Sequence, residues 1–111
     1  MNVAWEEFGS TCVIDLDGDL TGEASDALLR TAQERIDAGA KYLVIDAKGV
    51  GILDSRGLET LLGLTEAAIE RGGRCTLAAP DPLFESILEL AGLRDRLEIH
   101  SSVQEAARAL R

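Results

Sequence analysis

The residues of the chain best suited to chemistry form the run Asp54-Ser55-Arg56-Gly57, which lies between an apolar stretch and a leucine-rich one. Helical spacing of the leucines after it places Ser55 at or just before a helix N-terminus. Free backbone N–H groups and a positive helix end meet there. The run therefore predicts either a simple helix cap, made by Asp54 or Ser55, or a phosphorylation switch. In the switch, a phosphate on Ser55 is stabilised by the helix end and repels a partner on the same surface.

A third interpretation makes Ser55 the nucleophile of a small hydrolase or transferase, but the sequence gives it little support. A serine nucleophile needs an activating base, and His100 is the single histidine of the chain. The run Lys48-Gly49-Val50-Gly51 also lacks the Lys-Ser/Thr ending of a phosphate-binding loop. We therefore expect a protein that is not an enzyme and that needs no cofactor.

The acidic run Asp15-Leu16-Asp17-Gly18-Asp19 is a poor calcium loop, because its glycine is fourth rather than sixth and its twelfth residue is Asp26 rather than glutamate. Strict alternation instead predicts a strand with one acidic, solvated face. The two cysteines, Cys12 and Cys75, lie in separate apolar runs and predict buried free thiols. We expect no metal site.

Composition restricts the partners. The chain has 111 residues, 46% of them hydrophobic, which suits a single domain over residues 1–111. Eleven basic and 20 acidic residues give a net charge of −9, and residues 1–29 contain no Lys or Arg. This charge argues against nucleic acid and anionic membrane as partners. The acidic N-terminal part is either a solvated face or a surface that attracts a basic protein.

Neither a signal peptide nor an apolar run near the ~20 residues of a membrane span is visible in the sequence. We therefore expect a soluble cytoplasmic protein without membrane insertion. The sequence leaves the oligomeric state open between a monomer and a weak dimer.

The pattern of apolar residues predicts the element order β-β-α-β-α-β-α-β-α, an α/β fold. Thr21 can cap the first helix, which Gly39 ends, and Gly49 and Gly51 loosen the chain after the third strand. We expect a mixed sheet of four to five strands, formed by an N-terminal hairpin and alternating β-α units, with about four covering helices. Residues 41–47 form its central strand, and residues 12–17 and 74–79 lie beside it.

The run Asp54-Ser55-Arg56-Gly57-Leu58, preceded by VIDAKGVGIL, resembles the Asp-Ser-(Ser/Thr)-Gly-Leu signature of the STAS domain family. Three further segments are similar to that family in the same order, so the resemblance covers nearly the whole chain. They are Gly18-Asp19-Leu20 before the first helix, Gly72-Gly73 before RCTLAA, and the segment LELAGLRDRLEI.

The resemblance is to single-domain anti-sigma factor antagonists, and it implies a protein-binding switch. Ser55 would be phosphorylated by a partner that is both anti-sigma factor and serine kinase, with a histidine-kinase-like ATPase fold. The unphosphorylated form would bind that partner. The implied partner surface consists of Asp19, Thr21, Gly22, Asp54, Ser55, Arg56, Gly57 and Leu58.

Two positions depart from the family pattern. Arg56 stands where the family often has Ser or Thr, and its guanidinium can pair with a phosphoserine or alter kinase recognition. Thr21 replaces a frequent Asp, so contacts proposed there do not transfer. The resemblance also admits an alternative, a STAS subunit that docks on the ATPase of a lipid or solute transporter and is never phosphorylated at Ser55.

Overall fold

The computed structural model describes residues 1–110 as five strands, four α-helices and one short 3-10 turn. These elements are, in chain order, β1 Asn2–Phe8, β2 Thr11–Leu20, α1 Gly22–Asp37, β3 Tyr42–Leu53, α2 Ser55–Glu70, β4 Arg74–Ala78, α3 Pro82–Leu90, η1 Arg94–Arg96, β5 Glu98–His100 and α4 Val103–Ala109.

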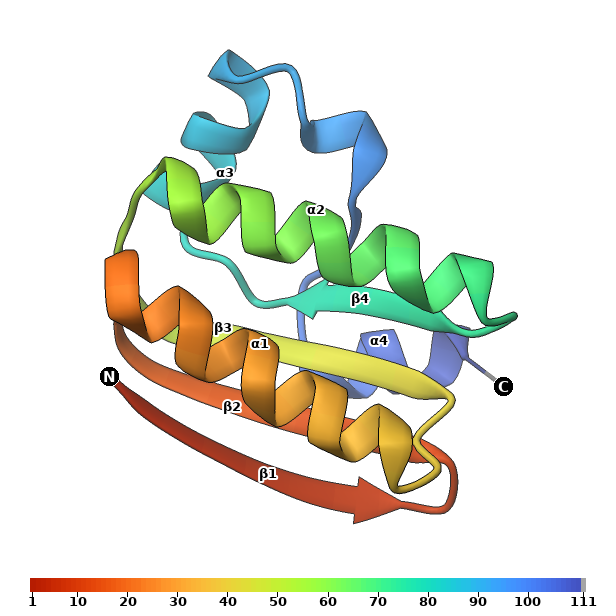
Figure 1. The fold of residues 1–111 in the computed structure, drawn as a ribbon. Helices are drawn as coiled ribbons and strands as arrows, with labels where there is room; N and C mark the ends of the chain where they lie inside the picture. Colours follow the sequence, from red (N-terminus) through yellow and green to blue (C-terminus); the bar gives the residue numbers. More distant parts are fainter. Residues whose placement is uncertain (111) are drawn as a thin grey trace.

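The sheet has the order β1-β2-β3-β4-β5, with β1 antiparallel to β2 and all later neighbours parallel (Figure 1). Each parallel strand returns to the sheet through an intervening helix or helical segment, as right-handed crossovers require. The predicted mixed sheet is thus confirmed, with β3 central and β2 and β4 beside it. The carboxyl ends of β2, β3 and β4 meet at one edge of the sheet.

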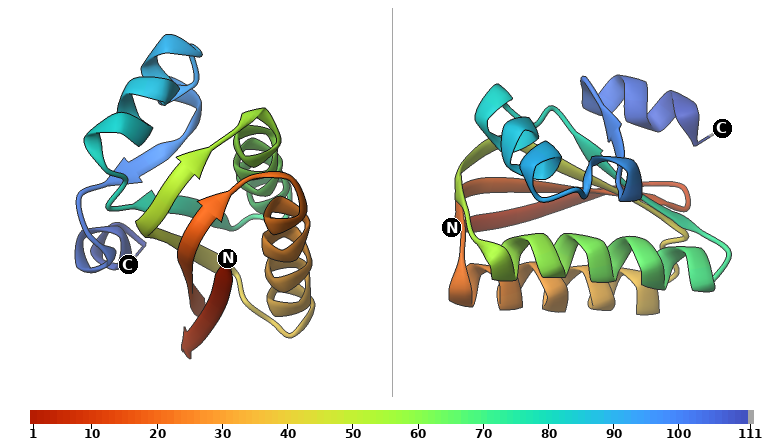
Figure 2. Two further views of the ribbon diagram at one scale, coloured as in Figure 1. Left: turned by 90° about the vertical axis from the view of Figure 1, so that its left-hand side faces the viewer. Right: turned by 90° about the horizontal axis from the view of Figure 1, so that it is seen from above.

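The two faces of the sheet are covered unequally. Helices α1 and α2 lie side by side on one face, and α4 lies on the other (Figure 2). The main core lies on the first face and contains Ile14 of β2 and Ile45 of β3, together with Phe84 of α3. A smaller cluster on the second face joins Val44 to Ala106 of α4. Because α4 is short, it covers only part of that face.

The third strand is longer than the sequence indicated. It continues through Gly49 and Gly51 to Leu53, so the expectation that the chain loosens after residue 47 is wrong. The glycines serve close approach instead, because β2 and β3 shift register in this stretch. A Cβ on Gly49 would lie 2.8 Å from the backbone oxygen of Leu16.

The remaining sequence expectations about the fold differ only locally from the structure. Cys12 and Cys75 are buried free thiols, and burial raises the pKa of Cys75 to about 12. Asp81 and Ser102 cap α3 and α4 by accepting backbone N–H bonds. The turn η1 was not expected.

Truncation of Val44 tests the central place of β3. Its side chain is fully buried against Ala78 and Ala106, so Val44→Ala should lower the free energy of unfolding by ~1–3 kcal/mol. Leu90→Ala is the control, because Leu90 is 89% exposed and its loss should change stability by less than about 0.5 kcal/mol. Urea denaturation measures both, and equal effects would contradict the assigned core.

A charged group joins β4, β5 and α4 at the far edge of the sheet. Arg74 of β4 donates to both carboxylate oxygens of Glu98 on β5, at 3.1 and 2.6 Å, and to the backbone oxygen of Ala109, at 2.7 Å. His100 lies 2.8 Å from the same carboxylate. Burial by itself raises the pKa of Glu98, but the hydrogen bonds from Arg74 and His100 outweigh it and lower the pKa below 4.5.

The lowered pKa predicts a pH-dependent contribution of Glu98 to stability. A carboxyl with a lower pKa in the folded state stabilises the fold above its unfolded pKa, and this is lost as the pH falls through the folded pKa. Glu98→Gln should therefore lower the free energy of unfolding at neutral pH, and the difference from wild type should shrink below about pH 4.5. Urea titrations over a pH series measure this, and a difference independent of pH would refute it.

Candidate functional site

The candidate site is built by two chain turns at the carboxyl edge of the sheet. One leads from β2 into α1, and the other leads from β3 into α2. The turns lie side by side because β2 and β3 are parallel neighbours, with Leu20 opposite Leu53 at their ends (Figure 1). The N-termini of α1 and α2 therefore meet at one end of the molecule, where ligand and partner sites of parallel α/β sheets usually lie.

A single carboxylate joins these two helix ends. One oxygen of Asp54, Oδ1, accepts the backbone N–H of Gly57 at 2.9 Å, the normal N-cap bond of α2. Its other oxygen, Oδ2, accepts the backbone N–H of Gly22 in the first turn of α1, at 3.2 Å. Asp54 thus satisfies a free donor at each helix start and holds the two helices in a fixed relation.

The predicted cap of α1 needs a correction. Thr21 occupies the N-cap position of α1, but its side chain makes no capping hydrogen bond. The carboxylate of Asp54 reaches the first turn from the neighbouring strand end and takes this place. A charged acceptor forms the stronger hydrogen bond with a helix N-terminus, which explains the exchange.

Gly57 allows the first turn of α2 to rest on the end of β2. The residue is buried, and a Cβ at this position would lie 2.5 Å from the backbone oxygen of Leu20 and 2.8 Å from Cδ1 of Leu53. Any side chain here would push the start of α2 away from the sheet. The glycine of the motif is therefore required by packing, and its contribution to a partner surface is indirect.

Ser55 is the first residue of α2 and is exposed at the edge of the sheet. Its neighbour Arg56 does not point freely into solvent, because Nη2 donates to Oδ1 of Asp26 on α1 at 2.7 Å. Both side chains of this pair are more than half exposed, so the bond is accessible to competing ions. The site thus offers a reachable hydroxyl beside a guanidinium that already has a carboxylate partner.

Two further predicted partner-binding residues, Asp19 and Leu58, differ in what they can offer a partner. Asp19 accepts the backbone N–H of Ile52 at 2.8 Å through Oδ1 and so joins the carboxyl ends of β2 and β3. Leu58 is half-buried and packs against the main core, which leaves only part of it for a partner.

Two residues at this edge escaped the sequence reasoning. Asp26 lies one helical turn after Gly22 and hence on the same side of α1, a spacing that could have revealed it. Ile52 is 62% exposed and would have been found had β3 been extended to Leu53.

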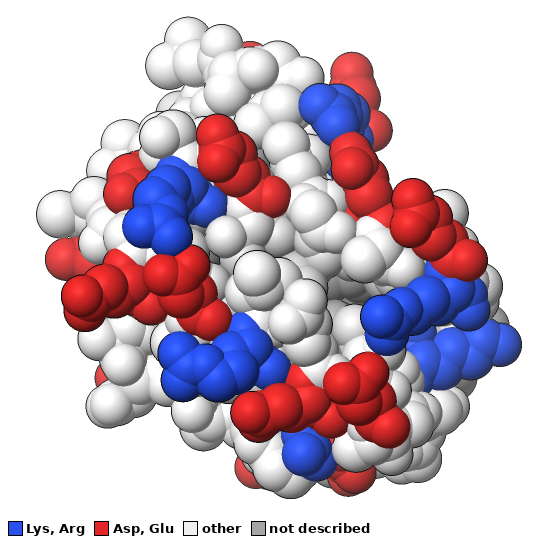
Figure 3. Space-filling model, viewed as in Figure 1, with Lys and Arg blue, Asp and Glu red and all other residues white. Residues whose placement is uncertain are grey.

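The face formed by α1 and α2 carries interleaved positive and negative side chains (Figure 3). This mixture differs from the uniformly acidic appearance of residues 1–29. Arg35, Arg56 and Arg96 on this side are each paired with a carboxylate. The electrostatic character of this face is therefore set by local ion pairs and not by a surplus of one sign of charge.

The chemistry that the site can perform by itself is limited. His100 is engaged by Glu98 on β5, in a different part of the sheet from Ser55. Within residues 1–110, no group of His, Cys, Asp and Glu is arranged to hold a metal ion. In the same residues no helix has the length and apolarity needed to cross a bilayer. What remains is an exposed hydroxyl on a rigid frame.

Comparison with known proteins identifies this frame. The family model described as STAS domain matches residues 2–106. The chain belongs to the STAS domain family. The resemblance stated from the motif around Ser55 is thereby confirmed, and the mixed five-stranded sheet with its helices is the fold of this family.

Three similar proteins illustrate the family. An anti-sigma F factor antagonist from Paenibacillus polymyxa is 22% identical over 103 residues, which are 92% of this chain and 88% of the relative. The phosphorylated form of the Bacillus cell fate determinant SpoIIAA has a TM-score of 0.75 and 23% identity, covering 99% of this chain and 100% of its own. The murine anion transporter Slc26a9 contains a similar fold, with a TM-score of 0.79 and 15% identity, covering 95% of this chain and 18% of the transporter.

Removal of the Asp54 carboxylate should affect both helix ends. Asp54→Ala deletes one helix cap and one bond to Gly22, so we expect a loss of ~1.5–3 kcal/mol in the free energy of unfolding. Asp81→Ala is the matched control, because Asp81 caps α3 alone, and its loss should be ~1 kcal/mol.

Hydrogen exchange makes the distinction specific. In Asp54→Ala the amides of both Gly22 and Gly57 should exchange faster, whereas Asp81→Ala should leave both unchanged. Faster exchange at Gly57 alone would show that the hydrogen bond from Gly22 to Asp54 does not stabilise the start of α1.

Proposed function

We propose that this STAS domain is an anti-sigma factor antagonist controlled by phosphorylation of Ser55. The unphosphorylated chain binds an anti-sigma factor that is also a serine kinase with a histidine-kinase-like ATPase fold. The protein acts in the cytoplasm as a single domain over residues 1–111 and catalyses no reaction. The observation that carries the proposal is the exposed hydroxyl of Ser55 in the family motif, at the meeting point of two helix N-termini.

The similar proteins support this reading. One is an anti-sigma F factor antagonist, and SpoIIAA exists in a phosphorylated form. The proposed partner surface lies around Ser55 at the carboxyl edge and comprises Asp19, Thr21, Gly22, Asp54, Ser55, Arg56 and Leu58, with the buried Gly57 contributing through packing.

The frame around Ser55 suits a switch that changes binding without changing the fold. A phosphate on Ser55 adds about −1.5 to −2 charges at the N-terminus of α2, where free N–H groups favour an anion. The carboxylate of Asp54 repels it, yet this carboxylate is already held by two N–H donors. The domain can therefore remain folded while its docking surface gains local negative charge.

Arg56 gives this chain a particular response to the phosphate. Its guanidinium is paired with Asp26 in the unmodified protein. A dianionic phosphate on the adjacent residue competes for that guanidinium more strongly than a single carboxylate does. On phosphorylation, Arg56 exchanges Asp26 for the phosphate, and the link between α1 and α2 at this point opens.

A transporter subunit is the second candidate. The fold also occurs within the anion transporter Slc26a9, so a STAS domain by itself is compatible with docking on transport machinery. In that case Ser55 is a passive contact residue and no kinase acts on it. The two functions differ in the partner that co-purifies, a kinase-like ATPase in one and a transporter ATPase in the other.

Variants of Ser55 test the switch after the partner has been captured from the source cell and identified by mass spectrometry. Ser55→Ala should bind that partner constitutively, and Ser55→Asp should bind weakly. Burying the added charge under a partner costs ~2–4 kcal/mol, which weakens binding by ~30- to 1000-fold. Calorimetric titration against the isolated partner measures the affinity.

Ser10→Asp is the matched control. It adds the same charge in the turn between β1 and β2, at the opposite end of the sheet, and should bind as wild type. Both Asp variants should melt close to wild type. Tight binding by Ser55→Asp together with no kinase labelling of Ser55 would sink the switch and favour the transporter subunit.

A further inference from the structure

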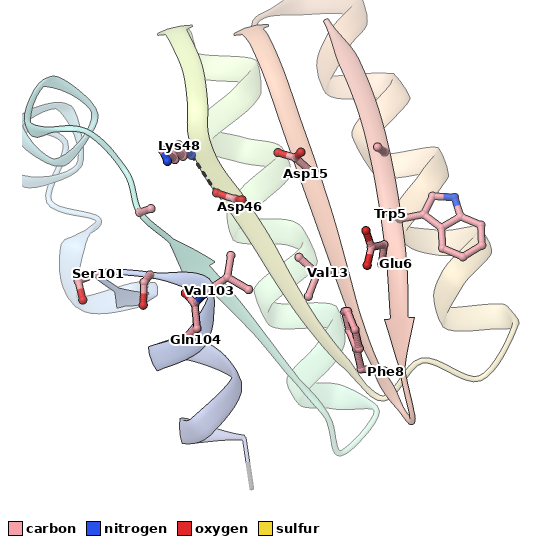
Figure 4. A pocket seen from close by; sticks show the side chains of 13 residues that line it. Trp5, Glu6, Phe8, Val13, Asp15, Asp46, Lys48, Ser101, Val103 and Gln104 are labelled. Carbon is pink, nitrogen blue, oxygen red and sulfur yellow. Dashed lines mark hydrogen bonds between the residues drawn. The ribbon is translucent and has the colours of Figure 1, made fainter.

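A second surface lies on the sheet face that α4 covers only in part. It is a groove with a volume of about 680 Å³ between β1 and the start of α4, open to solvent along one side (Figure 4). That volume falls within the range of about 300–1000 Å³ typical of ligand sites. Ser55 and the helices α1 and α2 belong to the opposite side of the sheet, since Ile14 and Ile45 pack there.

The groove has an apolar floor and acidic groups above it. Val13 of β2 and Val103 of α4 line it together with Phe8, which is 61% exposed at the end of β1. The charged lining consists of Glu6, Asp15, Asp46 and Lys48, three carboxylates against one ammonium group. In Figure 4 Glu6 and Asp15 turn to this face, whereas Trp5 points away beyond β1.

Two of the carboxylates are placed side by side. Asp15 and Asp46 are register partners on the adjacent parallel strands β2 and β3 and share one face of the sheet. Like charges directly opposite each other on a sheet destabilise it. Among the salt bridges formed by residues 1–110, none includes either residue.

The electrostatic consequence appears at Asp15. Partial burial raises the pKa of its carboxyl, and the charges of Asp46 and Asp17 raise it further. The backbone N–H of Lys48 donates to Oδ1 of Asp46 at 3.1 Å, but within residues 1–110 neither Asp15 nor Asp46 has a salt-bridge partner. A cation supplied from outside would meet two adjacent carboxylates, an exposed Asp15 and a half-buried Asp46, beside the apolar side chains of the groove.

We infer that this groove docks a basic, amphipathic segment of a partner protein, with Arg or Lys side chains at Asp15 and Asp46 and apolar side chains on Phe8, Val13 and Val103. Charge complementarity decides the occupant. A second copy of this chain carries a net charge of −9 and would bring further carboxylates to the groove. Arginine suits the pair best, because its planar group can bind two carboxylates at once.

Nuclear magnetic resonance titration with a designed probe tests this docking groove. The probe is an end-blocked peptide of alternating leucine and arginine, and the comparison peptide has glutamate in place of arginine. At about 0.15 M salt the arginine peptide should shift the amide signals of Glu6, Val13, Asp15 and Gln104 saturably. The glutamate peptide should shift none of them.

Paired variants make the test specific. Asp15→Asn combined with Asp46→Asn should weaken binding of the arginine peptide by about tenfold, as expected for two partly exposed ion pairs. Asp15→Asn alone should also leave stability equal or higher, because the charge it removes is unfavourable in the folded state.

The control combines Glu59→Gln with Glu70→Gln, which removes two exposed charges from α2 and should leave affinity within about twofold. Equal weakening by both double variants, or shifts spread over α1 and α2, would overturn the groove as a specific site. Ser55 is untouched throughout, so this result is independent of the switch.

Discussion

The two hydrogen bonds of the Asp54 carboxylate are the constraint on which the edge of the sheet depends. Parallel pairing brings the ends of β2 and β3 together, but it does not by itself fix the helices that follow. Asp54 does so by accepting one N–H from Gly57 and one from Gly22, and these donors belong to different helices. Gly57 completes the arrangement, because only a residue without a side chain lets α2 rest on Leu20.

This frame explains how a hydroxyl can be exposed and still have a fixed position. Ser55 follows the cap directly, so its position is determined by the backbone at the start of α2 rather than by contacts of its own. A charge added there falls on helix-end donors that are stabilised by anions. In the proposed switch, the fold would tolerate the charge for the same reason that it tolerates Asp54, and the effect would fall on the partner that lies against this surface.

The sequence was sufficient for the order of elements, because alternating apolar strands and helical leucine spacing agree along the whole chain. It was also sufficient for the motif, where Asp54 to Leu58 stand in consecutive positions. It failed where a residue's role depends on a neighbour distant in sequence. Glycines in β3 were misread as a break because the backbone of β2, which they accommodate, is more than thirty residues away.

Thr21 and Asp26 are two further residues whose roles depend on a neighbour that is distant in sequence. Threonine before a helix is a good cap by itself, yet a carboxylate from another strand end displaced it. Asp26 reads as an ordinary surface charge until Arg56 is brought to it across the two helices. Local sequence propensity predicts which side chains are able to cap a helix or form an ion pair. The tertiary arrangement determines which of them do so.

Successive side chains of a strand point to opposite faces of the sheet, and this alternation has a further effect on the domain. In β2, Ile14 enters the main core while Val13 and Asp15 face the opposite side, so one strand serves two surfaces. Helices α1 and α2 fill the first face and leave functional groups only at its edge. The short α4 leaves part of the second face open, with the like charges of Asp15 and Asp46 side by side. Either aspartate could be a neutral polar residue without disturbing the core, because both side chains lie on the face opposite the main core, and the inferred cationic partner would give this charge a role.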